Sequence, residues 1–458
     1  MSFIIYDIIF LVLFTLFVVI FLYKRRHNLK REGLLYLYRT KLGVKFIESS
    51  TKKYSKFFKL LEYPIVVSGY ALMLFGIWII IMLAYNYITS PYIAKALKIP
   101  VVMPLIPYLP ELFKIEFLPP FYFTYWILII AVIAIPHEFS HGIFARLNKI
   151  KILSTGFGFL GPFLAAFVEQ DDKQMQKSKK FSQLAILAAG TFANLIVAIL
   201  FGLILLLFFI STFTPAGISF NMYATTALNL SSISSVSLNP IENSSFVRIE
   251  ANNKSYFIDI NVLNESLSAN QDYIFVFDDS PAFNARLSGA ITEIDGNKIL
   301  SYQDLNFTLS SYKPGDNITI TTIDNKKNKR FYNITLGERD GKAFLGIGMI
   351  PYSSKGIFSI FNSIIEKVKA PFVYYESVLG DLGVFILNLL WWIVMVSLSV
   401  ALMNMLPLGI FDGGRFFFLT IWSLTGSRKI GERAFKFSTW FFLALIAVMI
   451  IKWFFIFI

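Results

Sequence analysis

Six long apolar segments alternate along this chain with basic or polar stretches. Each is long enough for an α-helix to cross the hydrocarbon core of a bilayer, which takes about 20 residues. They lie at about 3–23, 64–85, 121–145, 181–213, 382–405 and 439–458. Between the fourth and fifth segments, strand-like alternation and turn residues appear in a polar region. The pattern predicts a polytopic α-helical membrane protein with about six transmembrane helices and an inserted small extracytoplasmic β-rich domain.

The same pattern divides the chain into five parts. Residues 1–63 are an N-terminal membrane anchor with a basic cytoplasmic loop, and 64–120 are a second transmembrane helix with a proline-rich outer-surface segment. Residues 121–213 and 356–458 are the first and second parts of a membrane core. Between them, residues 214–355 are an extracytoplasmic region that contains the β-rich domain at about 273–351. The prolines of 90–120 are too frequent for a regular helix. In the last part we also expect a surface helix from Ile357 to about Glu376.

Composition favours a membrane protein over a soluble one. Hydrophobic residues make up 56% of the 458 positions, and only 16% are charged. The formal net charge of +13 is compatible with nucleic-acid binding, but the basic residues gather beside apolar segments, as in 24–31 and 52–59. That distribution is typical of cytoplasmic loops. We therefore expect a multi-pass protein of the cell membrane, with the lipid bilayer and no nucleic acid as a partner, and with both termini and the region 214–353 outside.

The third apolar segment contains the motif His137-Glu138-Phe139-Ser140-His141. On a helix, its two histidines lie one turn apart on one face, where both imidazoles can bind one Zn²⁺ while the glutamate reaches the attacking water. Ionisable groups inside a membrane segment indicate a functional site by default. A chance match, with both histidines satisfied by hydrogen bonds in the core, is the alternative. It is disfavoured because two of only three histidines fall at ligand spacing.

A zinc site on these histidines needs a third protein ligand. The chain has no cysteine, and its remaining histidine, His27, lies in the basic loop, so a carboxylate is required. Among the acidic residues near the predicted spans, Asp7 and Asp381 belong to the outer ends of their segments, and Glu138 is better used as a base. Asp412 remains.

Asp412 follows the fifth apolar segment, where Pro407 and Gly409 should end the regular helix near the cytoplasmic face. We therefore predict one zinc per chain held by His137, His141 and Asp412, within the bilayer near that face. Glu138 would take a proton from the attacking water and pass it to the leaving amine.

Two further stretches near the predicted core have open interpretations. The glycine-rich segment from Ser154 to Phe163 is either a hairpin against the membrane domain, whose strand edge could pair with an extended substrate, or a connecting loop. In the fourth apolar segment, Gly190 is best explained by close helix packing, whereas Asn194 needs a polar partner in the bilayer.

Three motifs on successive membrane segments resemble the site-2 protease family of intramembrane zinc metalloproteases. They are His137-Glu138-x-x-His141, Gly190-x-x-x-Asn194 and Asn404 with Asp412-Gly413. The resemblance implies cleavage of transmembrane substrate proteins in regulated proteolysis, usually after another protease has trimmed them. It also implies that Asn404 and Asn194 help to bind an unwound substrate strand.

A further resemblance lies in the polar insertion. The stretch from Ser280-Pro281-Ala282 to Asp295-Gly296 is similar to the PDZ domain that members of the family often carry. The inserted domain is therefore expected to be PDZ-like and extracytoplasmic.

Two other classes of function compete with a protease. A metal-ion transporter would also place histidine and carboxylate ligands in the bilayer, but it usually distributes them along a path. Here they are predicted to converge at one depth beside a general base. An inactive scaffold would be expected to have lost Glu138 or a ligand, and none is lost.

Overall fold

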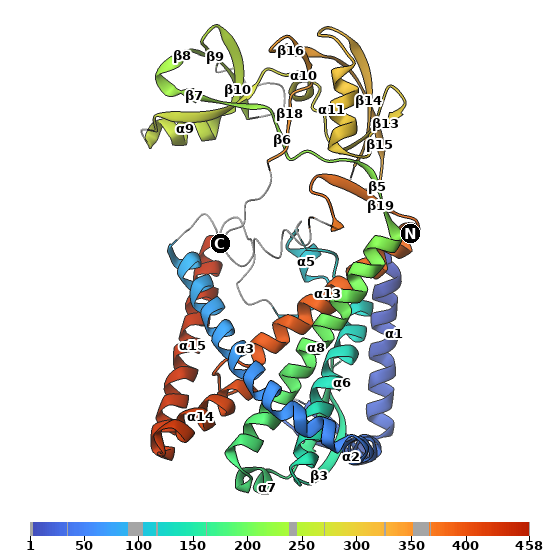
Figure 1. Ribbon diagram of the computed structural model, residues 1–458, viewed down its shortest axis with the longest axis vertical. Coiled ribbons are helices and arrows are strands. Elements are labelled where there is room, and N and C mark those ends of the chain that lie inside the picture. The colour runs from blue at the N-terminus through green and yellow to red at the C-terminus, as the bar shows by residue number, and fades with distance from the viewer. Residues whose placement is uncertain are drawn as a thin grey trace. The chain divides into compact units, whose positions relative to one another are not determined.

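The computed structural model describes residues 3–33, 35–89, 104–115, 118–161, 163–237, 245–269, 271–324, 327–350, 366 and 368–457. Two compact units make up the chain (Figure 1). Unit 1 comprises Met1–Leu207 and Phe385–Ile458, and unit 2 comprises Phe208–Val384.

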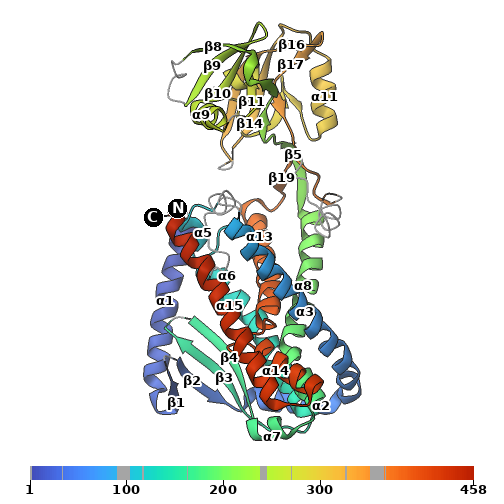
Figure 2. The ribbon, with the colours of Figure 1, turned by 90° about the vertical axis from the view of Figure 1, so that its left-hand side faces the viewer.

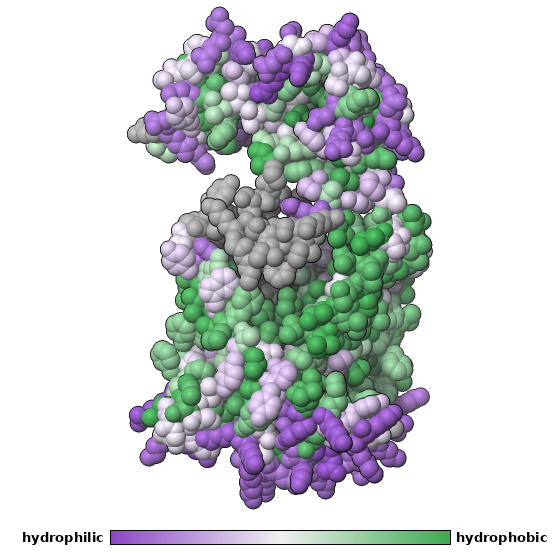
Figure 3. Space-filling model, in the orientation of Figure 1, coloured by the Kyte–Doolittle hydropathy of each residue, from purple (hydrophilic) through white to green (hydrophobic). Residues whose placement is uncertain are grey.

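Six helices of the described residues are long and apolar enough to span a membrane. They are α1 (Phe3–Lys24), α3 (Ser55–Thr89), α6 (Phe123–Leu147), α8 (Lys180–Thr212), α13 (Gly380–Asn404) and α15 (Arg428–Phe457). Hydrophobic residues cover these helices on the face of unit 1 seen in Figure 3, and hydrophilic residues gather at one end. The prediction of a helical membrane protein with an inserted β-rich region is confirmed at this level.

The boundaries of two helices differ from the prediction because helices continue beyond their apolar stretch. α3 begins at Ser55 rather than near Pro64, and α15 begins at Arg428 rather than near Thr439. From the sequence we expect Lys429, Arg433 and Lys436 in a cytoplasmic loop before the last apolar segment, but they lie on α15. Their long side chains can reach water from a helix end, so they do not need a loop. A separate helix, α14 (Asp412–Thr425), was also not foreseen.

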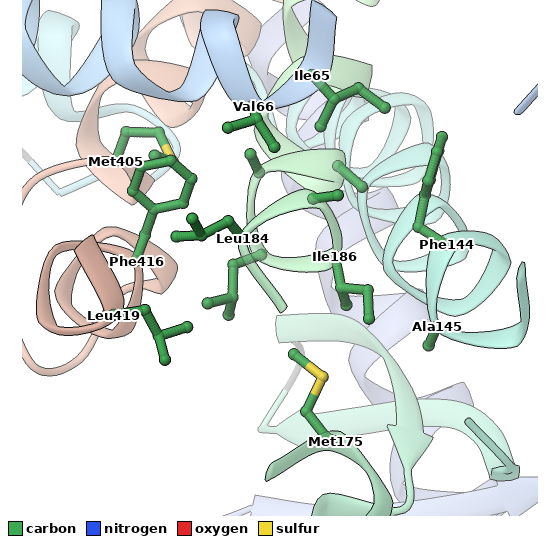
Figure 4. Packing of buried hydrophobic residues seen from close by; sticks show 14 of the residues in the cluster. Ile65, Val66, Phe144, Ala145, Met175, Leu184, Ile186, Met405, Phe416 and Leu419 are labelled. Carbon is green, nitrogen blue, oxygen red and sulfur yellow. The ribbon is translucent and has the colours of Figure 1, made fainter. Parts of the chain in front are cut away.

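The first half of helix α8 lies in the interior of unit 1. Its residues from Gln183 to Thr191 are all buried, so this stretch is covered on every side. Figure 4 shows Leu184 and Ile186 of α8 between Phe144 of α6 and Phe416 of α14. This packing brings α6, α8 and α14 together around one core.

Asp7 of α1 is buried and accepts hydrogen bonds from the first residues of α6. Its carboxylate oxygens accept from the Phe123 and Thr124 N–H groups at 2.7 and 3.0 Å, from the Thr124 hydroxyl, and from the Tyr108 hydroxyl at 2.6 Å. No side chain of α6 itself caps this helix end. The N-terminus of α6 is thus capped by another helix, which satisfies donors that every helix start leaves free.

The segment around 154–163 forms a hairpin, one of the two structures left open by the sequence. Its strands belong to an antiparallel sheet in the order β1-β2-β3-β4, seen beside α1 in Figure 2. The strands are β1 (Leu29–Glu32), β2 (Leu35–Thr40), β3 (Ile152–Leu160) and β4 (Phe163–Gln170). Gly156 is required where β3 meets β2, because a Cβ there would lie 2.0 Å from the Tyr38 carbonyl oxygen.

The predicted basic loop therefore contributes two strands, and it also contributes helix α2 (Leu42–Lys53). This helix packs against α6, where Ile47 is fully buried beside Gly142. Shorter elements complete unit 1: η1 (Arg26–Asn28), α5 (Leu109–Leu112) and α7 (Asp172–Lys177).

Unit 2 contains two larger sheets. The first has the order β7-β11-β10-β9-β8 and is covered by α9 (Ile260–Ser268). Its strands are β7 (Thr225–Asn229), β8 (Ile233–Ser237), β9 (Phe246–Ala251), β10 (Lys254–Asp259) and β11 (Tyr273–Asp278), with η2 (Leu230–Ser232) between β7 and β8. This sheet was not predicted, and the strand from Tyr273, which we assigned to the later domain, belongs to it.

The second sheet has the order β15-β14-β12-β5-β19, with β13 paired to β12. Its strands are β5 (Phe213–Ile218), β12 (Ala290–Ile294), β13 (Asn297–Lys298), β14 (Asn317–Ile323), β15 (Lys329–Thr335) and β19 (Val373–Ser377). Helices α10 (Pro281–Asn284) and α11 (Tyr302–Ser310) accompany it, as do the pairs β16 (Gly337–Arg339) with β17 (Lys342–Phe344) and β6 (Met222–Tyr223) with β18 (Ile347–Gly348).

The prediction of a surface helix from Ile357 to about Glu376 is wrong at its C-terminal end. Residues 373–377 form strand β19, which pairs with β5. The run Val373-Tyr374-Tyr375 favours a strand once a partner strand is present. Residues 351–365 lie outside the described part of the chain.

Candidate metal centre

Helix α6 carries both predicted histidine ligands on one face. The Nε2 atoms of His137 and His141 lie 3.1 Å apart, as expected for residues one helical turn apart. His137 is buried and His141 nearly so. The two rings therefore point to one position inside unit 1.

Asp412 reaches this position because the chain turns tightly after α13. That helix ends at Asn404, and α14 begins at Asp412 itself. A Cβ on Gly413 would lie 2.3 Å from the Met405 carbonyl, so only glycine fits there. The Asp412 Oδ2 lies 3.3 Å from the His141 Nε2 and 3.6 Å from the His137 Nε2. The structure thus brings the three predicted ligands together.

The three atoms have the separations that tetrahedral zinc requires. Zn–N and Zn–O bonds of about 2.0–2.1 Å at tetrahedral angles place two ligand atoms roughly 3.3 Å apart. Among the described residues, His137, His141 and Asp412 are the group of His and acidic side chains that could hold a metal ion. Two imidazoles and one carboxylate with a fourth position left open are a donor set of catalytic rather than structural zinc.

Contacts behind the rings orient the histidines. The Nδ1 of His141 lies 2.7 Å from the Ile186 carbonyl oxygen of α8, so Nδ1 carries the proton and Nε2 keeps its lone pair for a metal. The Nδ1 of His137 lies 3.0 Å from the Asn194 amide nitrogen, while the buried Asn194 Oδ1 has no partner among the described residues. Rotation of this amide lets Oδ1 accept from His137 Nδ1–H, which frees the second Nε2 as a ligand.

Asn194 therefore lies behind a ligand rather than in an open site. Its side chain is fully buried, whereas we expected it to contact a substrate strand. The structure favours a positioning role through His137.

Gly190 borders the metal position directly. A Cβ at this residue would lie 2.3 Å from the His141 Nε2 and 2.7 Å from the His137 Nε2. The sequence suggested only close helix packing for this residue. The spacing of Gly190 and Asn194 was the available signal, because residues four apart share a helix face and both face α6.

Glu138 is half-buried and is not part of the ligand group. Its Oε2 accepts a hydrogen bond of 3.1 Å from the backbone N–H of Val168 in β4. A carboxylate next to the ligands but outside their group is available as a base.

Asn404, the other expected substrate contact, lies at the end of α13 and lines a mostly apolar cavity of about 540 Å³. The cavity also contacts Gly76 and Ile80 of α3 and Met395 and Ser399 of α13. Asn404 thus faces a space between two membrane helices and is not in the ligand group.

A bundle of apolar helices with a His-Glu-x-x-His helix and a converging aspartate defines a membrane protein of the metalloprotease class. The model of peptidase family M50 matches residues 125–449. The chain belongs to this family, which is the site-2 protease family. It is also similar to the uncharacterized protein MJ0971 of Methanocaldococcus jannaschii, with 32% identity over 197 residues, which are 42% of this chain and 48% of that protein. The chain thus spans about half the length of this curated relative.

Proposed function

We propose that this protein is a zinc-dependent intramembrane endopeptidase that hydrolyses peptide bonds in or near transmembrane segments of its substrates. The observation that carries the proposal is the convergence of His137, His141 and Asp412 at tetrahedral separations beside Glu138, in a member of peptidase family M50. No observation favours a metal-ion transporter, because the ligands meet at one point next to a base.

The zinc ligands, Glu138 and Val168 have separate roles in the proposed reaction. When bound by the three ligands, zinc supplies Lewis-acid chemistry that makes a water nucleophilic near neutral pH. Glu138 takes the proton of the attacking water and delivers it to the nitrogen of the leaving amine. The Val168 N–H holds the Glu138 carboxylate at the side of β4.

The outer edge of β4 offers a place for an extended substrate. β4 is the last strand of its sheet, and the Val168 N–H points away from β3 toward Glu138. In an antiparallel ladder alternate residues point their backbone groups the same way, so Ala166 and Leu164 also point outward. A substrate strand that pairs with this edge has its peptide bonds held close to Glu138.

Substrate segments should approach through the membrane, because the cavity beside Asn404 lies between α3 and α13. The Asn404 amide can bind backbone groups that are freed when a substrate helix unwinds. Unwinding is easier where the substrate contains Asn, Gly or Pro, which are less favourable than Ala in a helix interior by roughly 0.7, 1 and 3 kcal/mol. Such substrates should be preferred.

The insertion between α8 and α13 makes bulky substrates unfavourable. The basic residues at one end of the membrane helices support a site near the cytoplasmic face and an insertion outside, by the positive-inside rule. A PDZ-like module in unit 2 then either binds a substrate tail or limits access. Substrates trimmed on the outside by another protease should therefore be cut faster.

The test compares the intact protein with Glu138→Gln on a model transmembrane substrate in detergent. A base that is not a ligand can be removed without emptying the site, so the variant should keep its zinc and its fold while cleavage falls by roughly 10²–10⁴-fold. Elemental analysis and thermal unfolding serve as controls. Near-normal turnover of Glu138→Gln would refute the mechanism.

A further inference from the structure

A second cavity, which is polar, lies at the hydrophilic end of unit 1 and shares no lining residue with the metal centre. It has a volume of about 570 Å³ and lies between α2 with the start of α3 on one side and the end of α6 on the other. Its lining is ionic rather than apolar, with the cations Lys52, Arg146 and Lys149, the hydroxyls of Thr51 and Ser55, and one carboxylate, that of Glu48. The proposed reaction does not use these groups.

The cavity carries excess positive charge. Glu48 lies 3.6 Å from Arg146 and neutralises one cation in part, since both side chains are about half exposed. Lys52 and Lys149 have no acidic partner among the residues that the structure describes. The Thr51 hydroxyl donates to the Ile47 carbonyl oxygen, which leaves the Ser55 hydroxyl as the hydroxyl donor of this lining. Two unpaired ammonium groups, a guanidinium and this hydroxyl around one space are suited to a phosphate group.

Lys149 occupies a backbone position that favours glycine. It follows the end of α6 with φ of +64°, and the Ile150 N–H bonds to the Ala145 carbonyl as in a left-handed helix cap. A lysine in this conformation is less favourable than glycine. A ligand for its ammonium group would compensate for this cost.

The cavity lies where phospholipid headgroups are expected. The 25 residues of α6 extend over about 37 Å, whereas the hydrocarbon core is about 30 Å thick, so the end at Arg146 reaches the headgroup layer. Phe46 of α2, Phe57 of α3 and Tyr54 between these helices are 58%, 57% and 48% exposed, as is typical of aromatic residues at a membrane interface. Figure 3 shows hydrophilic residues gathered at this end of unit 1.

We propose that this cavity is a binding site for the phosphate of an anionic phospholipid headgroup. Lys52 of α2 and Arg146 and Lys149 at the end of α6 bind the phosphate together, and the exposed aromatic side chains contact the glycerol and upper acyl region. The bound lipid thereby links α2 to α6 next to the catalytic motif. α2 already touches that motif, because the Phe46 and Phe139 rings lie 5.5 Å apart.

The test measures binding and stability, so it does not depend on the proposed catalytic function. The intact protein is placed in phosphatidylcholine nanodiscs, and phosphatidylglycerol is added stepwise while thermal unfolding and lipid adducts in native mass spectrometry are recorded. The unfolding temperature should rise with phosphatidylglycerol and saturate at one tightly retained lipid. The double variant Lys52→Gln/Lys149→Gly should bind it roughly 30-fold more weakly.

The choice of glycine at 149 separates binding from folding. Glycine suits the backbone there, so the variant should be at least as stable as the intact protein in phosphatidylcholine alone. The matched control is Lys173→Ala/Lys177→Ala, which removes the same charge from exposed positions of α7. It should keep the response to phosphatidylglycerol.

Three results would overturn the proposal. Equal weakening by both double variants would mean a diffuse attraction to the surface, and no weakening by the first would remove the cavity from consideration. The same stabilisation by inorganic phosphate in phosphatidylcholine would assign the site to a soluble phosphate rather than to a lipid.

Discussion

Replacing Gly190 with alanine should empty the metal centre while leaving the helix bundle folded. The added carbon would lie 2.3 Å from the His141 Nε2 and 2.7 Å from the His137 Nε2, where ordinary contacts begin at 3.4 Å. The rings must therefore retreat by roughly 1 Å, but the Ile186 carbonyl and Asn194 hold them from behind. Zinc sites tolerate deviations of only about 0.2 Å in their ligand distances.

The expected loss of zinc affinity follows from this mismatch in ligand position. Disturbing groups that orient zinc ligands costs about 10–100-fold in affinity, so displacing two ligands should cost roughly 100-fold or more. Global stability should change less, because the overpacking cost of about 1–3 kcal/mol is partly offset by the gain of about 1 kcal/mol when alanine replaces glycine in a helix.

The assay equilibrates the variants in buffered zinc and measures bound zinc, cleavage of a transmembrane substrate and thermal unfolding. Gly202→Ala on the same helix is the matched control, because a Cβ there meets nothing within 4 Å. It should keep full zinc and activity. A Gly190→Ala protein with one zinc per chain and normal turnover would refute the inferred crowding of the histidines.

Three further predictions follow from other parts of unit 1 and from the membrane topology. Alanine in place of any one of the three ligands should reduce the zinc content well below one per chain, and undiminished zinc in Asp412→Ala would remove that residue from the site. Asp7→Ala should destabilise the protein by about 2–4 kcal/mol, because buried N–H groups at the start of α6 lose their acceptor. Asp7→Asn should cost less, and unchanged thermal unfolding of Asp7→Ala would contradict this prediction. In this cysteine-free chain, a cysteine at exposed Ser268 should be labelled from outside the cell and one at Lys177 should not, and the reverse would overturn the orientation.

The membrane helices and the three residues that converge at the candidate metal centre could be predicted because their signals are local or follow by elimination. Apolar length alone marks a spanning helix, and the spacing of His137 and His141 needs only one helical turn. Asp412 could be inferred because cysteine is absent and the other acidic residues were assigned to the wrong side of the membrane or to the base.

Features that depend on contacts between distant segments were missed. β2 pairs with β3 across more than a hundred positions of chain, and nothing in residues 35–40 reveals that partner. The roles of Gly190 and Asn194 became visible only when α8 was placed against α6. The boundary of α15 was misjudged because hydropathy cannot separate a basic loop from the basic end of a helix.

The cap that Asp7 provides has a consequence for the biogenesis of the protein. α1 is synthesised 116 residues before the helix start that it completes. Until α6 enters the bilayer, α1 holds a carboxyl group without its native donors at membrane depth, and α6 without α1 exposes unpaired N–H groups. The two helices must therefore insert in the same direction before the cap can form. A fragment reduced to residues 125–449, the range of the family match, would lack both partners of this contact.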